Sequence, residues 1–241
     1  MENESGSSPF KRILLKISGE ALMGESQFGI ESKALERICT EIKEIKKLKV
    51  EIAIVVGGGN IFRGINLVER GADRVTSDNM GMLATVINSL AMMDRLEQMG
   101  IYTRVMSAVS IEDFAEQYIL RRAVRHMEKG RIVILAAGTG NPYFTTDTAA
   151  ALRAMEIGAD LLIKATNVDG VYSADPKKVE KAEFIPRLTY MDVLTKELKV
   201  LDSTAVSLLK DNNIPLRVIN LNESGNLKRV VMGEEIGTLI S

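Results

Sequence analysis

Cysteine and histidine are almost absent from this sequence of 241 residues, and it contains one of each. The single cysteine, Cys39, excludes an internal disulfide and is typical of a reducing compartment, so a cytoplasmic protein is expected. The helical pattern around it predicts a buried structural thiol rather than a nucleophile. The one histidine, His126, stands in a charged stretch that predicts a solvated helix end rather than a catalytic base. One residue of each type is also too few for a structural zinc site.

An excess of positive charge is lacking as well. Lys and Arg number 31 and Asp and Glu number 32, which gives a formal net charge of −1. We therefore expect neither a nucleic-acid-binding surface nor a membrane-binding one, and affinity for phosphate must come from local amides, lysines and arginines. The most apolar helical pattern, at 80–93, is interrupted by Thr85, Asn88 and Ser89. It is too short and too polar to span a bilayer, so a soluble protein is expected.

The sequence does contain a regular alternation of apolar, β-branched runs and helical patterns. Several runs are continuously apolar, as expected of strands covered on both faces. The alternation predicts an α/β fold with a doubly wound, mostly parallel central sheet and helices on both faces. The expected strands are 12–17, 51–56, 103–107, 131–136, 161–164 and 216–219, and the expected helices are 32–48, 78–99, 111–128, 146–157 and 203–212.

No composition shift, repeat or low-complexity linker divides the chain, so residues 11–241 are expected to form one domain with two lobes. The polar residues 1–9 lack the apolar core of a signal peptide, and residues 1–10 are expected to be a disordered tail. Near the other end, 228–231 and 238–240 predict a closing hairpin on the edge of the sheet. Ligands of open α/β sheets bind beyond the carboxyl ends of the strands, so the chemistry is expected there.

The first two expected strands end in residues suited to phosphate. Lys16 precedes a small, flexible Ser-Gly pair that can place backbone amides beside its ammonium group. The second strand runs into three glycines at 57–59, which leave no Cβ between a phosphate and the main chain, and Arg63 follows within reach. A plain glycine turn is the alternative. Phe62 replaces the last glycine of Gly-x-Gly-x-x-Gly, and Gly-x-x-x-x-Gly-Lys-Ser/Thr is missing, so dinucleotide-binding folds and Walker-type NTPases lose support.

A third strand end, 137–148, combines hydroxyls, an amide, two aromatic rings and an aspartate just before a helix. Thr146 or Asp147 can cap that helix, whose amino end attracts anions. Tyr143 or Phe144 can lie against a base. Helix capping alone explains one Thr-Asp pair but not the whole run.

A fourth strand end, 164–176, begins with a second strand-end lysine, Lys164. Two anionic nucleotides would require such a second cation. Tyr172 can contact an adenine, and Asn167 and Asp175 can bond to a base or a ribose. A turn built on the Asp-Gly and Asp-Pro pairs is the plainer interpretation.

Together these strand ends resemble the amino acid kinase superfamily and, within it, the bacterial uridylate kinases. The resemblance extends over residues 11–240. Its most specific parts are Asp-Asn-Met-Gly-Met-Leu-Ala-Thr at 78–85 and Gly-Thr-Gly-Asn-Pro-Tyr-Phe-Thr-Thr-Asp at 138–147. The other matching segments are 16–19, 57–63, 164–176, 197–202 and 229–233.

This resemblance implies the reversible reaction ATP + UMP giving ADP + UDP, in de novo synthesis of the pyrimidine nucleotides UDP and CTP. It also implies a homohexamer, Mg²⁺ carried by ATP without direct protein ligands, inhibition by UTP and, in many members, activation by GTP. The GTP response is linked in the family to the residues after Gly24, where this sequence has the variable stretch Glu25-Ser26-Gln27.

The resemblance further assigns UMP to an N-terminal lobe and ATP to a C-terminal lobe. The residues expected to bind ATP are Lys16, Ile17, Ser18, Gly19, Gly59, Arg63, Thr166, Asn167, Tyr172 and Asp175. The residues expected to bind UMP are Gly58, Asp78, Thr139, Gly140, Asn141, Pro142, Tyr143, Phe144, Thr145 and Thr146.

Phosphoryl transfer needs in-line placement and neutralisation of charge rather than covalent help from the protein. We expect Lys16 and Lys164 to flank the moving phosphoryl group and stabilise its equatorial oxygens. Asp147 and Asp202 are expected to orient those lysines or the Mg²⁺. The phosphate of UMP is already an anionic nucleophile at neutral pH, so no general base is required.

Several alternatives stay open at this stage. Asp78 can be only the N-cap of its helix, and the methionine-rich pattern at 80–93 fits a core helix or, as we favour, a subunit interface. A sibling kinase for a carboxylate or carbamate would lack the pattern at 78 and 139–146. A nucleotide sensor or oxyanion-storage protein would not need both lysines and both aspartates, and the neutral charge gives no sign of a nucleic-acid-binding regulatory role. Residue types alone do not separate UMP from CMP or dUMP.

Overall fold

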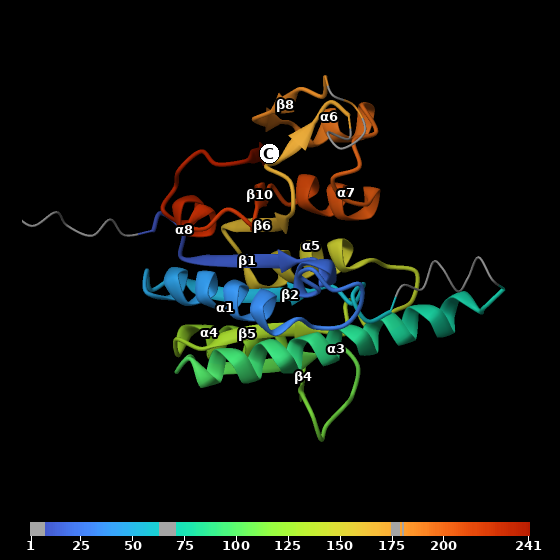
Figure 1. Ribbon diagram of the computed structural model, residues 1–241, viewed down its shortest axis with the longest axis vertical. Coiled ribbons are helices and arrows are strands. Elements are labelled where there is room, and N and C mark those ends of the chain that lie inside the picture. Colours follow the sequence, from blue (N-terminus) through green and yellow to red (C-terminus); the bar gives the residue numbers. More distant parts are fainter. Residues whose placement is uncertain (1–7, 63–70, 175–178, 180) are drawn as a thin grey trace, which may run out of the picture.

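The computed structural model describes residues 8–62, 71–174, 179 and 181–241. Its described residues form a central sheet of nine strands in the order β4-β3-β5-β2-β1-β6-β10-β11-β9, which Figure 1 shows stacked along the long axis of the molecule. Every neighbouring pair is parallel except β10 and β11. The strands are β1 (Arg12–Ile17), β2 (Glu51–Val56), β3 (Thr103–Ser107), β4 (Glu116–Gln117), β5 (Ile132–Ala136), β6 (Leu161–Thr166), β9 (Arg187–Leu188), β10 (Leu216–Asn220) and β11 (Thr238–Ile240). The predicted doubly wound, mostly parallel sheet is confirmed.

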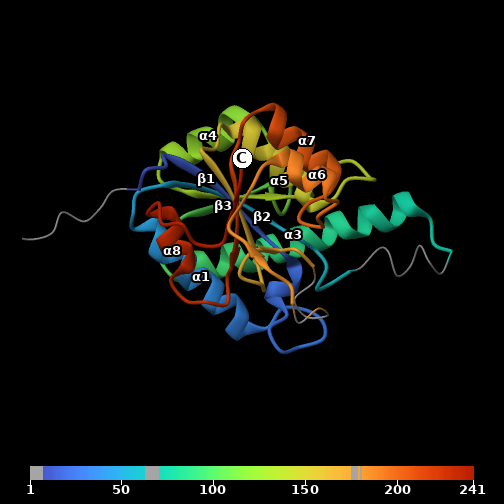
Figure 2. The same ribbon diagram turned by 90° about the horizontal axis from the view of Figure 1, so that it is seen from above.

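Helices cover both faces of this sheet, as Figure 2 shows. One face carries α1 (Ser32–Lys46), α3 (Arg74–Gln98) and α8 (Asn226–Val231). The other carries α4 (Leu120–Glu128), α5 (Thr146–Ile157), α6 (Tyr190–Thr195) and α7 (Ser203–Asp211). A short 3-10 helix, η1 (Gly19–Leu22), follows β1, and β7 (Val171–Tyr172) pairs with β8 (Phe184–Ile185) as a separate antiparallel ribbon.

The core consists of two apolar layers because successive side chains of a strand point to opposite faces. Ile13 and Leu15 of β1 pack on the α1 side, and Leu14 between them packs on the α5 side. Helix α1 buries Ile38 and Ile42 at helical spacing against the first layer. Ile13, Leu14, Leu15 and Ile17 of β1 are fully buried, so this strand is covered on both faces.

The strand order places the junction of the two halves of the chain at the β1–β6 pair. Strands β1 to β5 lie on one side of this junction, and β6 and the strands after it lie on the other. Such a reversal of strand order is where open α/β sheets bind ligands, beyond the carboxyl ends of the strands. The carboxyl ends of β1, β2, β5 and β6 are therefore brought to one edge.

Two sequence-based expectations about secondary structure are wrong. The C-terminal hairpin does not form, because 228–231 belongs to α8, and its Leu227, Val230 and Val231 are buried at helical spacing. The β-branched valine pair resembled a strand. Strand β11 pairs antiparallel with β10 and parallel with β9, so it is not an edge strand. The helix expected at 111–128 forms only from Leu120, as α4, and its expected first half contains β4, which pairs with β3.

The packed chain begins earlier than residue 11. Ser8 Oγ donates a hydrogen bond to Val231 O at 2.8 Å, and Phe10 packs against the core layer on the α1 side. The rest of the expected tail, residues 1–7, lies outside the described residues. Within the described part of the chain, no helix combines the length and the apolar character that crossing a bilayer would require.

Candidate active site at the carboxyl edge of the sheet

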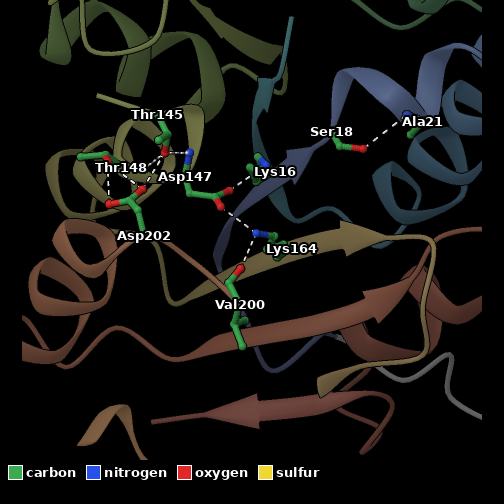
Figure 3. A network of polar contacts seen from close by, with 9 residues as sticks. All are labelled: Lys16, Ser18, Ala21, Thr145, Asp147, Thr148, Lys164, Val200 and Asp202. Carbon is green, nitrogen blue, oxygen red and sulfur yellow. Dashed lines mark hydrogen bonds and ion pairs between the residues drawn. The ribbon is translucent and has the colours of Figure 1, made fainter. Parts of the chain in front are cut away.

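Two lysines stand side by side where the central strands end. Lys16 of β1 and Lys164 of β6 are register partners on neighbouring parallel strands, and their side chains are only 9% and 16% exposed. Two like charges in such positions repel each other. Asp147, in the first turn of α5, lies between them, with Oδ1 2.6 Å from Lys16 Nζ and Oδ2 2.7 Å from Lys164 Nζ (Figure 3). One carboxylate is thus the shared counter-ion of two ammonium groups.

Burial and charge act in opposite directions on these groups. Burial alone would raise the pKa of Asp147, but the charges of Lys16 and Lys164 outweigh it and hold that pKa below its usual range. Burial lowers the pKa of Lys164, and the charge of Asp147 offsets this only in part. Lys164 Nζ also donates to Val200 O (Figure 3). With both lysines protonated, the cluster keeps one excess positive charge, which suits it to receive an anion.

Asp202 contacts hydroxyl groups rather than the lysines. Its Oδ2 accepts a hydrogen bond from Thr145 Oγ1 at 2.6 Å, and Thr148 Oγ1 lies 2.9 Å from both carboxylate oxygens (Figure 3). Asp202 also caps α7 by accepting from Ala205 N. The expected direct contact of Asp202 with the lysines is therefore absent from the described residues, although its charge raises the pKa of Lys164. Asp202 instead joins α7 to the amino end of α5.

The three positions after β2 are glycine for different physical reasons. A Cβ on Gly57 would lie 2.9 Å from Gly19 N, and one on Gly58 would lie 2.8 Å from Gly81 O of α3. Both glycines permit close packing of main chain against main chain. A Cβ on Gly59 would meet nothing within 4 Å. Main-chain packing thus accounts for Gly57 and Gly58, and the open space at Gly59 fits the expected approach of a phosphate; a phosphate contact at any of the three stays a prediction. Arg63 lies outside the described residues.

A cavity of about 290 Å³ lies beside this glycine loop, between the start of α3 and the 138–146 loop. Its walls include seven of the ten residues expected to bind UMP, namely Gly58, Asp78, Thr139, Asn141, Phe144, Thr145 and Thr146. Gly140, Pro142 and Tyr143 do not belong to the described lining, and Gly140 packs with φ 81° against Ala108. Sequence reasoning missed Phe62, Arg74, Ser77, Gly81, Met82, Thr85 and Gly138.

Asp78 is a wall residue and not a helix cap. Helix α3 begins at Arg74, and its N-cap is Asp73, whose side chain accepts from Thr76 N at 2.7 Å. Asp78 Oδ2 accepts from Arg74 Nε and from Tyr143 N, both at 2.7 Å, and the guanidinium of Arg74 lies 5.5 Å from the centre of the Tyr143 ring. The N-cap alternative is thus wrong. The Arg-Asp spacing of four was the signal that could have drawn attention to Arg74.

A larger cavity of about 610 Å³ lies on the other side of Lys164, under the β7–β8 ribbon. Thr166 and Tyr172, both expected to bind ATP, line it, and Tyr172 packs edge-to-face on Phe184 with ring centres 5.6 Å apart. The segment 196–200 forms a further wall that no residue pattern had singled out as a binding surface. Asp175 lies outside the described residues.

The remaining residues expected to bind ATP are distributed differently. Ser18 and Asn167 line a separate cavity of about 290 Å³, which shares Lys164 and Thr166 with the cavity of about 610 Å³. The side chain of Ile17 is fully buried in the core, so only its main chain can face a ligand. Gly19 packs so closely on the glycine loop that a Cβ would lie 2.7 Å from Gly59 N. Lys164 and Thr166 thus line both cavities on this side.

Cys39 and His126 take no part in this edge of the sheet. Cys39 is fully buried in the core, and burial raises the pKa of its thiol to about 12, so the predicted burial of this thiol is confirmed. The charged stretch around His126 is the exposed end of α4, as predicted, but the side chain of His126 itself is only 13% exposed and is held by Glu116 and Arg131. Its partners lie on β4 and next to β5.

Comparison with known proteins adds to this geometry. Residues 11–220 match the family model described as the amino acid kinase family. The structure is similar to that of UMP kinase from Bacillus anthracis, with a TM-score of 0.94 and 42% identity over 97% of this chain and 96% of that one. UMP kinase from Ureaplasma parvum gives a TM-score of 0.90 and 37% identity over 96% and 98%. Uridylate kinase from Archaeoglobus fulgidus gives 0.73 and 28% over 95% and 99%.

Proposed function

The chain belongs to the amino acid kinase family, and on that premise we propose that it transfers the γ-phosphoryl group of ATP to UMP, giving UDP and ADP. The observation that carries the proposal is the buried pair Lys16 and Lys164 with one shared carboxylate, set between cavities of about 610 and 290 Å³. The likeness to UMP kinases of two bacteria over nearly the whole chain supports UMP as the acceptor.

Each nucleotide has a cavity of suitable composition. We assign ATP to the larger cavity, where the ring of Tyr172 can contact adenine and Thr166 lines the wall. UMP is assigned to the cavity beside the glycine loop, where Asp78 can accept a ribose hydroxyl. The N-terminal half of the chain would then form a UMP lobe and the C-terminal half an ATP lobe. Arg63 and Asp175 stay predictions as ATP ligands.

The chemistry follows from charge placement. A phosphate oxygen of UMP attacks the γ-phosphorus, the bond from that phosphorus to the bridging oxygen breaks, and ADP leaves with the electron pair. Lys16 and Lys164 stabilise the negative charge on the equatorial oxygens, and Asp147 holds their two ammonium groups at a fixed separation. One phosphoanhydride replaces another, so the reaction is expected to be reversible.

Mg²⁺ would enter with ATP. The oxygens of Asp147 are paired with lysines and those of Asp202 with hydroxyl and amide donors, so neither carboxylate is free to replace a phosphate oxygen on the metal. The ion would neutralise charge on the β- and γ-phosphates. The chain's own residues would hold the phosphates to which it is bound.

An oligomer is part of the proposal. Helix α3 exposes Met80, Leu83 and Ile87 to between 43% and 53%, on one side of the helix. A single stripe of large apolar side chains on a long helix is typical of a protein–protein contact. We assign this stripe to contact with a second copy of the chain, within the homohexamer that the family resemblance implies. UTP, with the base of UMP and a triphosphate like that of ATP, is the expected inhibitor; activation by GTP is left open, because residues 25–27 are a variable stretch.

One coupled assay tests the proposal. ADP release is followed with ATP and Mg²⁺ and with UMP, CMP or dUMP in turn, and then with UTP or GTP added. UMP-dependent release is expected, with UMP preferred. Bound ATP without ADP release would favour a nucleotide sensor, and release that depends on a carboxylate or carbamate would favour a sibling kinase. Product UDP would feed the de novo synthesis of pyrimidine nucleotides in the cytoplasm.

A further inference from the structure

We propose that Thr85 and Asn88, on the buried side of α3, are positioning residues. They hold the glycine loop at 57–60 and the 138–146 loop, which form two walls of the cavity assigned to UMP, called the acceptor cavity below. Both lie inside the protein, with 3% and 0% of their surface exposed. Polar groups in such places cost stability unless they are hydrogen-bonded, so their partners show what they are for. The identity of the acceptor rests on the proposed function, whereas the positioning itself rests on the contacts below.

Asn88 holds the glycine loop through a closed pair of amides. Its Nδ2 donates to Gly57 O at 2.7 Å and to Asn60 Oδ1 at 2.6 Å. In return, Asn60 Nδ2 donates to Asn88 Oδ1 at 3.0 Å and to Gly29 O at 2.9 Å. All four amide hydrogens are therefore used. Because a peptide is planar, fixing Gly57 O also fixes the direction of the N–H group of Gly58, which faces the opposite way.

Thr85 holds the first residue of the second loop. Its Oγ1 accepts from Ala137 N at 2.8 Å and donates to Met82 O at 2.7 Å, so the hydroxyl has both a donor and an acceptor partner. Ala137 has φ 62°, a left-handed conformation that is strained for a residue with a side chain. The bond to Thr85 is what secures this conformation at the point where the chain leaves β5 and enters the 138–146 loop.

Helix α3 and the glycine loop are closely packed against each other. A Cβ at Gly58 would lie 2.8 Å from Gly81 O and 2.9 Å from the Cβ of Ala84. Both loops therefore depend on the same two turns of α3, where Ala84, Thr85 and Asn88 lie. A small displacement of this stretch would move both walls of the acceptor cavity together.

Ser89 provides a matched control on the same helix. It is fully buried, as Asn88 is, but its hydroxyl donates only to Thr85 O within α3. Ser89→Ala removes a buried hydroxyl without touching either loop. Thr85→Val removes the acceptor of Ala137 N in a side chain of similar shape, and Thr85→Ser restores a hydroxyl.

The test uses the full chain and two readouts. The first is steady-state kinetics with ATP and UMP for Thr85→Val, Thr85→Ser, Ser89→Ala and Asn88→Ala. Thr85→Val is expected to raise KM for UMP about tenfold, the effect of losing one buried hydrogen bond, with KM for ATP within about twofold. Thr85→Ser should recover most of this change, and Ser89→Ala should show none. Asn88→Ala, if it folds, should raise KM for UMP as well.

The second readout is amide hydrogen exchange in a peptide that covers Ala137, followed by mass spectrometry without any nucleotide. Exchange there should become about tenfold faster in Thr85→Val and stay unchanged in Ser89→Ala. Equal exchange and equal KM for UMP in these two variants would overturn the proposal. If the wild type does not phosphorylate UMP, the proposed function fails, and the exchange experiment still decides whether Thr85 positions the loop.

Discussion

Replacing Asp147 by asparagine removes the negative charge that lies between the two strand-end lysines. Lys16 and Lys164 would then face each other as buried neighbours without a counter-ion. We expect Asp147→Asn to be much less stable than the wild type without ligand. We also expect it to gain more stability from ATP than the wild type does, because the triphosphate supplies the missing negative charge. Turnover should fall even so, because the lysines are no longer held at their separation.

The size of the stability loss in Asp147→Asn follows from the burial of the lysine pair. Removing one partner of a buried ion pair costs about 3–5 kcal/mol, because a charge is left uncompensated in a poorly solvated place. For a chain of this size, roughly 2–4 °C of Tm corresponds to each kcal/mol, so a loss of roughly 6–20 °C is expected. If ATP binds the variant ten times more tightly, a saturating concentration returns about 1.4 kcal/mol more than it gives the wild type.

Thermal unfolding at pH 7 with and without ATP and Mg²⁺, in the absence of UMP, measures both effects. The folded-state pKa of Asp147 is depressed, so its contribution to stability is complete above the ordinary value of 3.8 and is lost as pH falls through the lowered pKa. The full effect is therefore present at pH 7. The control is Asp202→Asn, which loses hydrogen bonds to Thr145 and Ala205 but leaves the lysine pair compensated. It should be less destabilised and gain no affinity for ATP.

An Asp147→Asn variant whose Tm rises with ATP by no more than that of the wild type would refute this reasoning. The shared-counter-ion description would then be wrong, and the lysines would have to be compensated in another way. Equal stabilisation of both variants by ATP would have the same meaning.

Three further predictions concern the lysines and the oligomer. Lys164→Met should reduce kcat about 10²–10³-fold, while Lys196→Met, in an exposed residue of the same cavity, should have little effect on kcat. Because burial lowers the pKa of Lys164 and its ammonium form is needed, kcat should fall with rising pH at a midpoint below the ordinary lysine value of 10.5. This midpoint should move to still lower pH in Asp147→Asn, since the carboxylate raises that pKa. Leu83→Glu on the exposed stripe of α3 should reduce the particle mass in light scattering, whereas Phe28→Glu, exposed elsewhere, should leave it unchanged.

The sequence predicted elements whose signals are local. The run of apolar residues in β1 and β2 indicates buried parallel strands. The helix expected at 146–157 is α5, but its N-cap is Thr145 and not Thr146 or Asp147 as expected, and Gly158 ends it. The valine pair of α8 wrongly indicated a strand, because β-branched residues favour strands. The helix forms because its buried side chains have helical spacing, and which side chains are buried depends on what packs against them.

Sequence reasoning found those site residues whose role can be read from their own segment, and it missed those whose role depends on residues far away in the chain. Two lysines at strand ends were recognised, and the register that makes them neighbours follows from pairing β1 with β6. Gly57 and Gly58 were recognised as part of a glycine-rich strand end. They must be glycine because Gly19 and α3 pack against them, and no local sequence pattern indicates these contacts. The amide pair of Asn60 and Asn88 could not be found for the same cause.

The pairing of β1 with β6 also has a consequence for how the chain acquires its binding site. All of β2 to β5 separates the two strands in sequence, so their contact has a high contact order and is entropically expensive to close. A chain emerging from the ribosome has Lys16 long before Lys164 exists. The lysine pair therefore forms only after the second half of the sheet has been added, and an anion that contacts both lysines can stabilise only the finished fold.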